Sequence, residues 1–258
     1  MIERYELIDN SILLRYLFYP RRQHSKPREG AFDLSVPVEA NVDIVCRAYP
    51  AAADGPWIIY FHGNGEVVSD YDGIAPLYKN RQLNLLVADY RGYGASGGTP
   101  TFGDLVADAR KIFEHLAADF PAELKPDRWF VMGRSLGSIS ALELAAAYPD
   151  QIGGMIIESG FISVAGLISH LGLPSPGNLS GLEKSYREMA AKISLSSLII
   201  HGERDSLVPL SQGRELFEAL GSAKKEMVVI SLADHNDIMF VDSHKYMSAI
   251  EDFIRRNR

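Results

Sequence analysis

Cysteine is almost absent from this sequence, and long apolar runs are lacking as well. Cys46 is the only cysteine in 258 residues, so an intramolecular disulfide and a cysteine-based zinc site are both excluded. The longest stretch without Asp, Glu, Lys or Arg, Ser159–Leu182, contains prolines, glycines and a histidine and is too polar to span a bilayer. Near the start, acidic residues precede a short apolar stretch that Arg15 interrupts, so a signal peptide is not expected. We therefore expect a soluble protein with no integral membrane segment in the reducing cytoplasm.

Clusters of basic residues are missing too. The chain has 26 Lys and Arg against 33 Asp and Glu, which gives a formal charge of −7. Nucleic-acid binding requires a basic surface, so nucleic-acid partners are not expected. The apolar share of 47% and the charged share of 23% are those of an ordinary globular protein. The oligomeric state is left open by these features.

Short apolar runs alternate with segments of helical periodicity along most of the chain. This alternation predicts an α/β fold with a mostly parallel sheet flanked by helices. The six expected central strands are Trp57–Phe61, Leu83–Ala88, Trp129–Met132, Gly154–Ile157, Leu195–Ile200 and Met227–Ile230. Two earlier segments, Ser11–Tyr19 and Ala31–Val45, are expected to be antiparallel edge strands shortened by prolines.

Helices are expected between the strands. Their predicted ranges are about Asp104–Ala118, with Asp104 as the cap, then Ile139–Tyr148, Ser211–Leu220 and about Asp242–Arg256. Residues 161–193 do not fit the alternation and contain two short helical fragments. Insertions of this kind on α/β sheets are usually functional lids. We expect one domain over residues 1–258, with a cap at about 161–193.

Two pentapeptides match the GxSxG pattern of a nucleophile elbow, Gly133–Gly137 and Gly94–Gly98. At such a turn the serine is strained, and the flanking positions must be small because strand and helix nearly collide. Only Ser135 lies between an apolar strand and a helix. Ser96 lies in a glycine-rich loop and is expected to be part of a flexible connection. Ser135 is therefore the predicted nucleophile.

A serine hydroxyl needs a base that takes its proton and an acid that orients that base. His235 lies in the loop between the last expected strand and the last helix, on the edge of the sheet where ligands bind, and is the predicted base. His62 and His201 also end strands but stand next to glycines. Asp205, after the strand that ends at Ile200, is the predicted acid, with Glu158 as its rival.

An oxyanion hole requires N–H groups directed at the oxygen of the tetrahedral intermediate. The backbone N–H of Leu136, directly after the nucleophile, is one expected donor. The other is the backbone N–H of Asn64, in the glycine-rich turn His62–Gly65 that follows a strand. A plain turn at the end of a strand is the alternative interpretation of this motif.

Five motifs in this order, FHGNG, DYRGYGASGG, GRSLG, HGERDSLVP and ADHND, resemble those of the α/β-hydrolase superfamily, most closely its Bem46-like branch of serine hydrolases. The resemblance covers roughly residues 30–258. It implies an eight-stranded sheet with a small cap, and a Ser135 nucleophile with Asp205 and His235 as partners. It also implies esterase, thioesterase or related acyl hydrolysis without a cofactor or a metal.

The expected reaction is two-step acyl transfer on a small-molecule ester or thioester. Apolar residues of the charge-free segment 159–182 are candidates for an acyl pocket, or they simply pack the lid onto the body. An aspartate or cysteine nucleophile would indicate other chemistry on the same fold. Peptidase and perhydrolase activities would use the same triad. A non-catalytic binding module on a hydrolase scaffold is the alternative from a different class.

Overall fold

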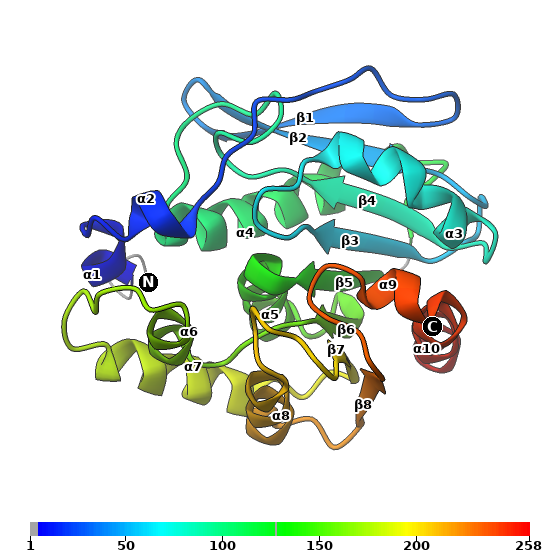
Figure 1. The fold of residues 1–258 in the computed structure, drawn as a ribbon. Helices are drawn as coiled ribbons and strands as arrows, with labels where there is room; N and C mark the ends of the chain where they lie inside the picture. The colour runs from blue at the N-terminus through cyan, green and yellow to red at the C-terminus, as the bar shows by residue number, and fades with distance from the viewer. Residues whose placement is uncertain (1–4, 127) are drawn as a thin grey trace.

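The computed structural model describes residues 5–126 and 128–258, and its centre is one eight-stranded sheet (Figure 1). The strand order is β1-β2-β4-β3-β5-β6-β7-β8. The strands are β1 (Phe32–Glu39), β2 (Val42–Tyr49), β3 (Trp57–Phe61), β4 (Asn84–Ala88), β5 (Trp129–Arg134), β6 (Ile152–Glu158), β7 (Ser197–Gly202) and β8 (Lys225–Ile230). Pairs β1–β2 and β2–β4 are antiparallel, and the other pairs are parallel. The predicted α/β-hydrolase fold class, with a mostly parallel sheet, is confirmed.

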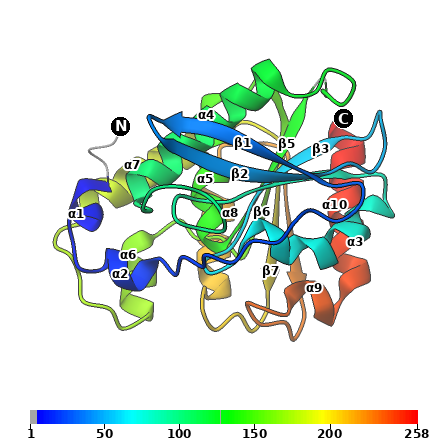
Figure 2. The same ribbon diagram turned by 90° about the horizontal axis from the view of Figure 1, so that it is seen from above.

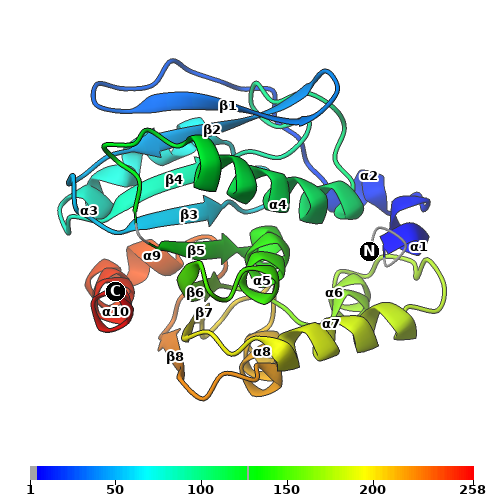
Figure 3. The same ribbon diagram turned by 180° about the vertical axis from the view of Figure 1, so that it is seen from behind.

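Helices cover both faces of this sheet (Figure 3). On one face, a core cluster contains buried residues of α4 (Phe102–Asp119), α5 (Ser138–Ala147), α7 (Ser180–Lys192) and α8 (Leu210–Ala219). On the other face, the second cluster contains α3 (Ala75–Lys79), α9 (Ile238–Val241) and α10 (Ser243–Asn257). Because side chains alternate across a strand, the central strands supply apolar residues to both clusters. This explains why those strands appear in the sequence as continuous apolar runs.

The segment Ser11–Tyr19 was wrongly expected to be a strand. It contains α2 (Leu14–Leu17), preceded by α1 (Glu6–Asp9). Leu13 and Leu17, four residues apart, are buried, whereas Ile12 and Tyr16 are exposed. A spacing of four places side chains on one face of a helix, but an apolar run with few polar residues hides that period.

The segment Ala31–Val45 contains the edge strand β1 and the first half of its partner β2. A tight turn joins β1 to β2, and Asn41 in that turn has φ 65°. Pro37 lies in β1, which is the edge of the sheet, where a proline removes no ladder hydrogen bond from a central strand.

Helix α4 begins before the predicted cap. Thr101 is the N-cap, and its hydroxyl accepts a hydrogen bond from the N–H of Asp104 at 3.0 Å. Asp104 is thus in the first turn, where the negative charge of its carboxylate interacts favourably with the positive end of the helix dipole. The Asp9 carboxylate also accepts hydrogen bonds from Phe102 N at 2.8 Å and Gly103 N at 3.0 Å, which ties α1 to the start of α4.

The segment expected to form a cap contains α6 (Val164–His170) and α7. Viewed from above, α1, α2 and α6 gather at the same end of the molecule (Figure 2), although α6 is far from α1 and α2 in the sequence. Within the described part of the chain, no helix combines the length and apolar character needed to cross a membrane.

Candidate active site

Strand β5 runs into a sharp turn at Ser135 before α5 begins. Ser135 has φ 51°, a left-handed conformation that residues with a Cβ avoid. A Cβ added to Gly133 would lie 2.3 Å from the carbonyl oxygen of Gly137, and one added to Gly137 would lie 2.1 Å from that of Phe61. The two glycines are therefore required by close packing, as the steric argument for an elbow predicts. By contrast, the buried hydroxyl of Ser96 accepts a hydrogen bond from Val45 N at 2.9 Å and joins its loop to β2.

Replacing Gly137 with alanine is expected to destabilise the protein by about 3 kcal/mol or more, because the new methyl group would overlap backbone atoms that cannot move away easily. Urea unfolding measures this change. Gly181→Ala is the matched control: no heavy atom lies within 4 Å of its added Cβ, and helix propensity favours alanine there. Equal stability of the two variants would contradict the packing described at the elbow.

The structure brings Asp205 and His235 together at the ends of β7 and β8. Nδ1 of His235 lies 2.8 Å and 3.0 Å from the two carboxylate oxygens of Asp205. Asp205 also accepts hydrogen bonds from Leu207 N at 3.1 Å and Val208 N at 2.7 Å. Burial alone would raise the pKa of Asp205, but the hydrogen bond and charge of His235 outweigh it and lower that pKa. The carboxylate is therefore ionised at neutral pH. It contacts Nδ1 of His235, so Nε2 is the ring nitrogen that does not face Asp205.

The loop that carries His235 also lies against the elbow. Arg134, the residue directly before Ser135, donates a hydrogen bond from Nη2 to the backbone oxygen of His235 at 2.8 Å. Contact between these segments is therefore direct, although the two residues are separated by 101 positions in the sequence.

The rival residues have other partners. Oε1 of Glu158 lies 3.1 Å from Nε of Arg134, and its Oε2 accepts a hydrogen bond from the hydroxyl of Tyr246 at 2.6 Å. Nε2 of His62 lies 3.1 Å from Asp89. Nε2 of His201 lies 2.8 Å from the backbone oxygen of Val208 and, at the longer distance of 3.5 Å, faces Oδ2 of Asp205. Burial lowers the pKa of His201 and so favours its neutral form.

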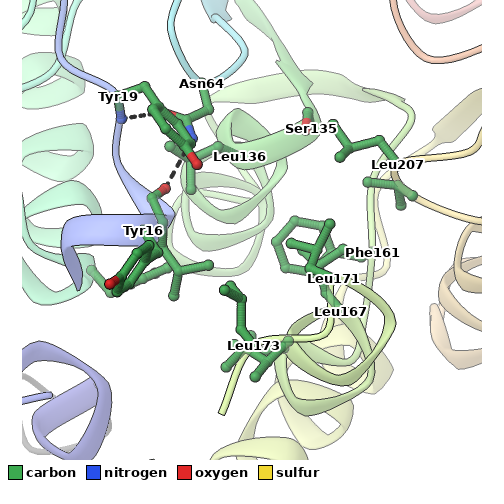
Figure 4. Close-up of a pocket in the computed structure, with 15 residues that line it drawn as sticks. Tyr16, Tyr19, Asn64, Ser135, Leu136, Phe161, Leu167, Leu171, Leu173 and Leu207 are labelled. Carbon is green, nitrogen blue, oxygen red and sulfur yellow. Dashed lines mark hydrogen bonds between the residues drawn. The ribbon is translucent and has the colours of Figure 1, made fainter. Parts of the chain in front are cut away.

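Asn64 and Leu136 border the same cavity as Ser135 (Figure 4). The side chain of Asn64 accepts hydrogen bonds from the hydroxyl of Tyr93 at 2.6 Å and from Tyr19 N at 2.9 Å. Its Nδ2 donates to the backbone oxygen of Leu17 at 2.9 Å. The Asn64 side chain thus fixes the N-terminal segment against the loop after β3. The assignment of the Asn64 and Leu136 backbone N–H groups as oxyanion donors stays a prediction.

The cavity at Ser135 has a volume of about 250 Å³, and its walls are mostly apolar. Part of the wall comes from the charge-free segment, part from the loop after Asp205, and part from α2 and α4. The lining residues are Tyr16, Leu17, Tyr19, Asn64, Phe102, Ser135, Leu136, Phe161, Val164, Leu167, Ile168, Leu171, Leu173, Leu207 and Val208. Sequence reasoning missed the contribution of α2. The four-residue spacing of Leu13 and Leu17 was a signal for the helix, but no signal placed that helix at the cavity.

Metal-binding residues do not gather in the part of the chain that the structure describes. There, no group of three His, Cys, Asp or Glu side chains is arranged to hold a metal ion.

Comparison with known proteins places the fold and the motifs in a family. A family model described as serine aminopeptidase, S33, matches residues 55–179. Protein bem46 of Schizosaccharomyces pombe is 31% identical over 208 residues, which cover 78% of this chain and 68% of that protein. The uncharacterized protein YfhR of Salmonella typhimurium is 29% identical over 70% of this chain and 64% of its own length. The chain thus spans about two thirds of the length of these relatives.

The fold is similar to that of solved structures. The esterase Pf2001 of Pyrococcus furiosus superposes with a TM-score of 0.75 at 22% identity, covering 92% of this chain and 98% of that structure. The similarity to bem46 extends over most of both chains. The chain therefore belongs to the α/β-hydrolase family that includes bem46.

Proposed function

We propose that the protein is a serine hydrolase that cleaves carboxylic ester or thioester bonds through an acyl-enzyme. One observation carries this proposal: the strained Ser135 lines an apolar cavity, and the loop that carries His235, whose ring is paired with Asp205, lies against the same elbow. The resemblance of the fold to an esterase of Pyrococcus furiosus supports it.

The proposed reaction has two steps. Oγ of Ser135 attacks the acyl carbon while Nε2 of His235 takes its proton, and the resulting oxyanion accepts hydrogen bonds from the backbone N–H groups of Asn64 and Leu136. His235 then gives the proton to the leaving alcohol or thiol as the bond to the acyl carbon breaks. Water attacks the acyl-enzyme by the same route and releases the acid together with free Ser135.

The cavity favours an uncharged acyl group. Its lining residues include no Asp, Glu, Lys, Arg or His among those the structure describes, so a charged group would lose hydration without gaining a partner there. A short- to medium-chain acyl group fits a cavity of about 250 Å³. Hydrolysis of p-nitrophenyl acetate, butyrate, octanoate and palmitate tests this, and we expect the highest kcat/KM for butyrate or octanoate. Rates that do not depend on acyl length would refute the assignment of the cavity as an acyl pocket.

Leu167→Trp is expected to narrow the cavity, because Leu167 lies on α6 and lines its wall. We expect kcat/KM for the octanoate ester to fall about tenfold, the scale set by a few apolar contacts, while the acetate ester changes less than about threefold. Leu7→Trp, at an exposed position that is not part of the cavity lining, is the matched control. If both esters respond equally to Leu167→Trp, the acyl chain does not lie where we propose.

Aminopeptidase activity is a second candidate, because the matching family model has that description. An aminopeptidase must bind the ammonium group at the start of a peptide, which calls for a carboxylate near the nucleophile. Acidic side chains are absent from the described cavity lining. We therefore expect aminoacyl p-nitroanilides to be hydrolysed far more slowly than the esters in the same assay.

A further inference from the structure

Arg134, directly before the proposed nucleophile, is a buried arginine with partners on three other segments. Its side chain is 11% exposed. Nε lies 3.1 Å from Glu158, and Nη1 lies 2.5 Å from Glu66. Nη2 donates to the backbone oxygen of His235 at 2.8 Å and to Oδ1 of Asn236 at 2.9 Å. All three nitrogens of the guanidinium are therefore engaged.

Each partner belongs to a different part of the proposed site. Glu66 follows the glycine-rich turn that contains Asn64, and its Oε2 accepts a hydrogen bond from Gly63 N at 2.8 Å. A Cβ on Gly63 would lie 2.3 Å from Nη1 of Arg134, so the turn packs directly on the guanidinium. His235 is the proposed base. One side chain thus connects the segments that carry the nucleophile, the base and an oxyanion donor.

The charges around the guanidinium hold it in place. Burial alone would lower the pKa of Arg134, but the carboxylates of Glu66 and Glu158 outweigh it, so the pKa is raised and the group stays charged. Glu158 is itself fixed by the hydroxyls of Tyr246 at 2.6 Å and Tyr60 at 3.3 Å. Glu66 receives a further hydrogen bond from the hydroxyl of Tyr71 at 2.8 Å. Both acidic partners therefore have fixed positions.

The contacts require the shape of arginine as well as its charge. Arginine has a rigid planar fork with donors in several directions, whereas lysine presents one nitrogen on a flexible chain. A lysine at this position can neutralise one carboxylate, but it cannot reach Glu66, Glu158 and the oxygen of His235 together. A difference in activity between the wild-type arginine and a lysine at this position would therefore distinguish the effect of side-chain geometry from that of charge.

We propose that Arg134 is a positioning residue, whose guanidinium sets the place of the His235 loop and of the Gly63–Glu66 turn relative to Ser135. The inference rests on the proposed function and adds a residue to it. Arg134 does not line the apolar cavity, so it acts on the geometry of the reacting groups rather than on the binding of the acyl chain. Its loss is expected to lower kcat and leave KM nearly unchanged.

Arg134→Lys tests this with p-nitrophenyl butyrate. We expect kcat to fall about 10²-fold, the effect of a displacement of about 1 Å at a reacting group, with KM within about twofold of wild type. Arg187→Lys, at an exposed arginine paired with Glu215, is the matched control and should leave kcat unchanged. Hydrogen exchange by mass spectrometry supplies the second readout: faster exchange confined to residues 63–66 and 231–238 is the expected result.

Full activity of Arg134→Lys would overturn the proposal, because charge alone would then suffice. So would a fall in kcat with faster exchange throughout the molecule, which would indicate a general loss of stability. If Arg134→Lys fails to fold, Asn236→Ala keeps every buried charge and removes one part-buried hydrogen bond, and it should lower kcat about threefold to tenfold. An unchanged kcat in that variant would then overturn the proposal. A wild-type protein that hydrolyses no ester would refute the proposed function itself, whereas an active wild type with an active Arg134→Lys refutes only this inference.

Discussion

Replacing Ser135 with alanine is expected to lower kcat for ester hydrolysis by about 10⁴–10⁶-fold, because the variant lacks the hydroxyl that we propose forms the acyl-enzyme. Residual catalysis over water would come from the oxyanion donors and from binding. The fold should be retained, since alanine is no larger than serine and its methyl group meets no new neighbour. Initial rates at saturating p-nitrophenyl butyrate measure the loss, and thermal unfolding followed by circular dichroism checks the fold.

Ser96→Ala is the matched control, because Ser96 is the serine of the second GxSxG sequence. Its hydroxyl binds Val45 N, so the variant should lose about 1 kcal/mol of stability and keep its kcat within about twofold. A folded Ser135→Ala protein with substantial activity, or an inactive but folded Ser96→Ala protein, would contradict the choice of nucleophile.

Asp205→Asn is expected to lower kcat by about 10⁴-fold while leaving the shape of the site intact. Asparagine keeps an oxygen for Leu207 N and Val208 N and therefore presents its NH₂ group to Nδ1 of His235. An NH₂ donor at Nδ1 favours the tautomer with hydrogen on Nε2, and that nitrogen then cannot accept the serine proton. Steady-state kinetics with the butyrate ester measures the effect.

The effect of Asp205→Asn on stability should also depend on pH. The pKa of Asp205 is lowered in the folded protein, so its ionisation contributes stability that is present above its ordinary value of 3.8 and is lost as pH falls through the folded value. Asp205→Asn removes that contribution, so the difference in unfolding free energy between wild type and variant should shrink in acid.

Asp234→Asn is the control for the kinetic effect. Asp234 contacts the N–H groups of Ser206 and His235 but not the imidazole, so its replacement should lower kcat less than about tenfold. An equal fall in kcat for Asp205→Asn and Asp234→Asn would contradict the role assigned to Asp205.

The central strands and the elbow were predictable because their causes are local. Trp57–Phe61 is apolar throughout and is bounded by glycines, and β3 has those bounds in the structure. The glycines of GRSLG follow from the close approach of strand and helix at a turn of this kind, and in the structure a Cβ on Gly133 would overlap the backbone of Gly137 where the helix begins. Chain order also selected Asp205 and His235, which the structure places within hydrogen-bond distance.

Features that depend on distant contacts were not predictable. The N-terminal segment has apolar residues on most sides, so its helical period was hidden, and its place at the cavity depends on Asn64, which is 47 positions from Leu17. Likewise, Arg134 meets partners that are 24, 68 and 101 positions away, and a single arginine inside a motif carries no sign of them. Thr101 was overlooked as a cap because Asp104, three residues later, is also a favourable cap residue.

Covalent labelling with a fluorophosphonate determines whether Ser135 is an activated nucleophile, because this reagent requires a serine that a nearby base activates. We predict one adduct per chain by intact mass, located on the peptide that contains Ser135. Labelling should be absent in Ser135→Ala and strongly slowed in Asp205→Asn. An unlabelled wild-type protein, or an adduct on any residue other than Ser135, would contradict the assignment of Ser135 as the activated nucleophile.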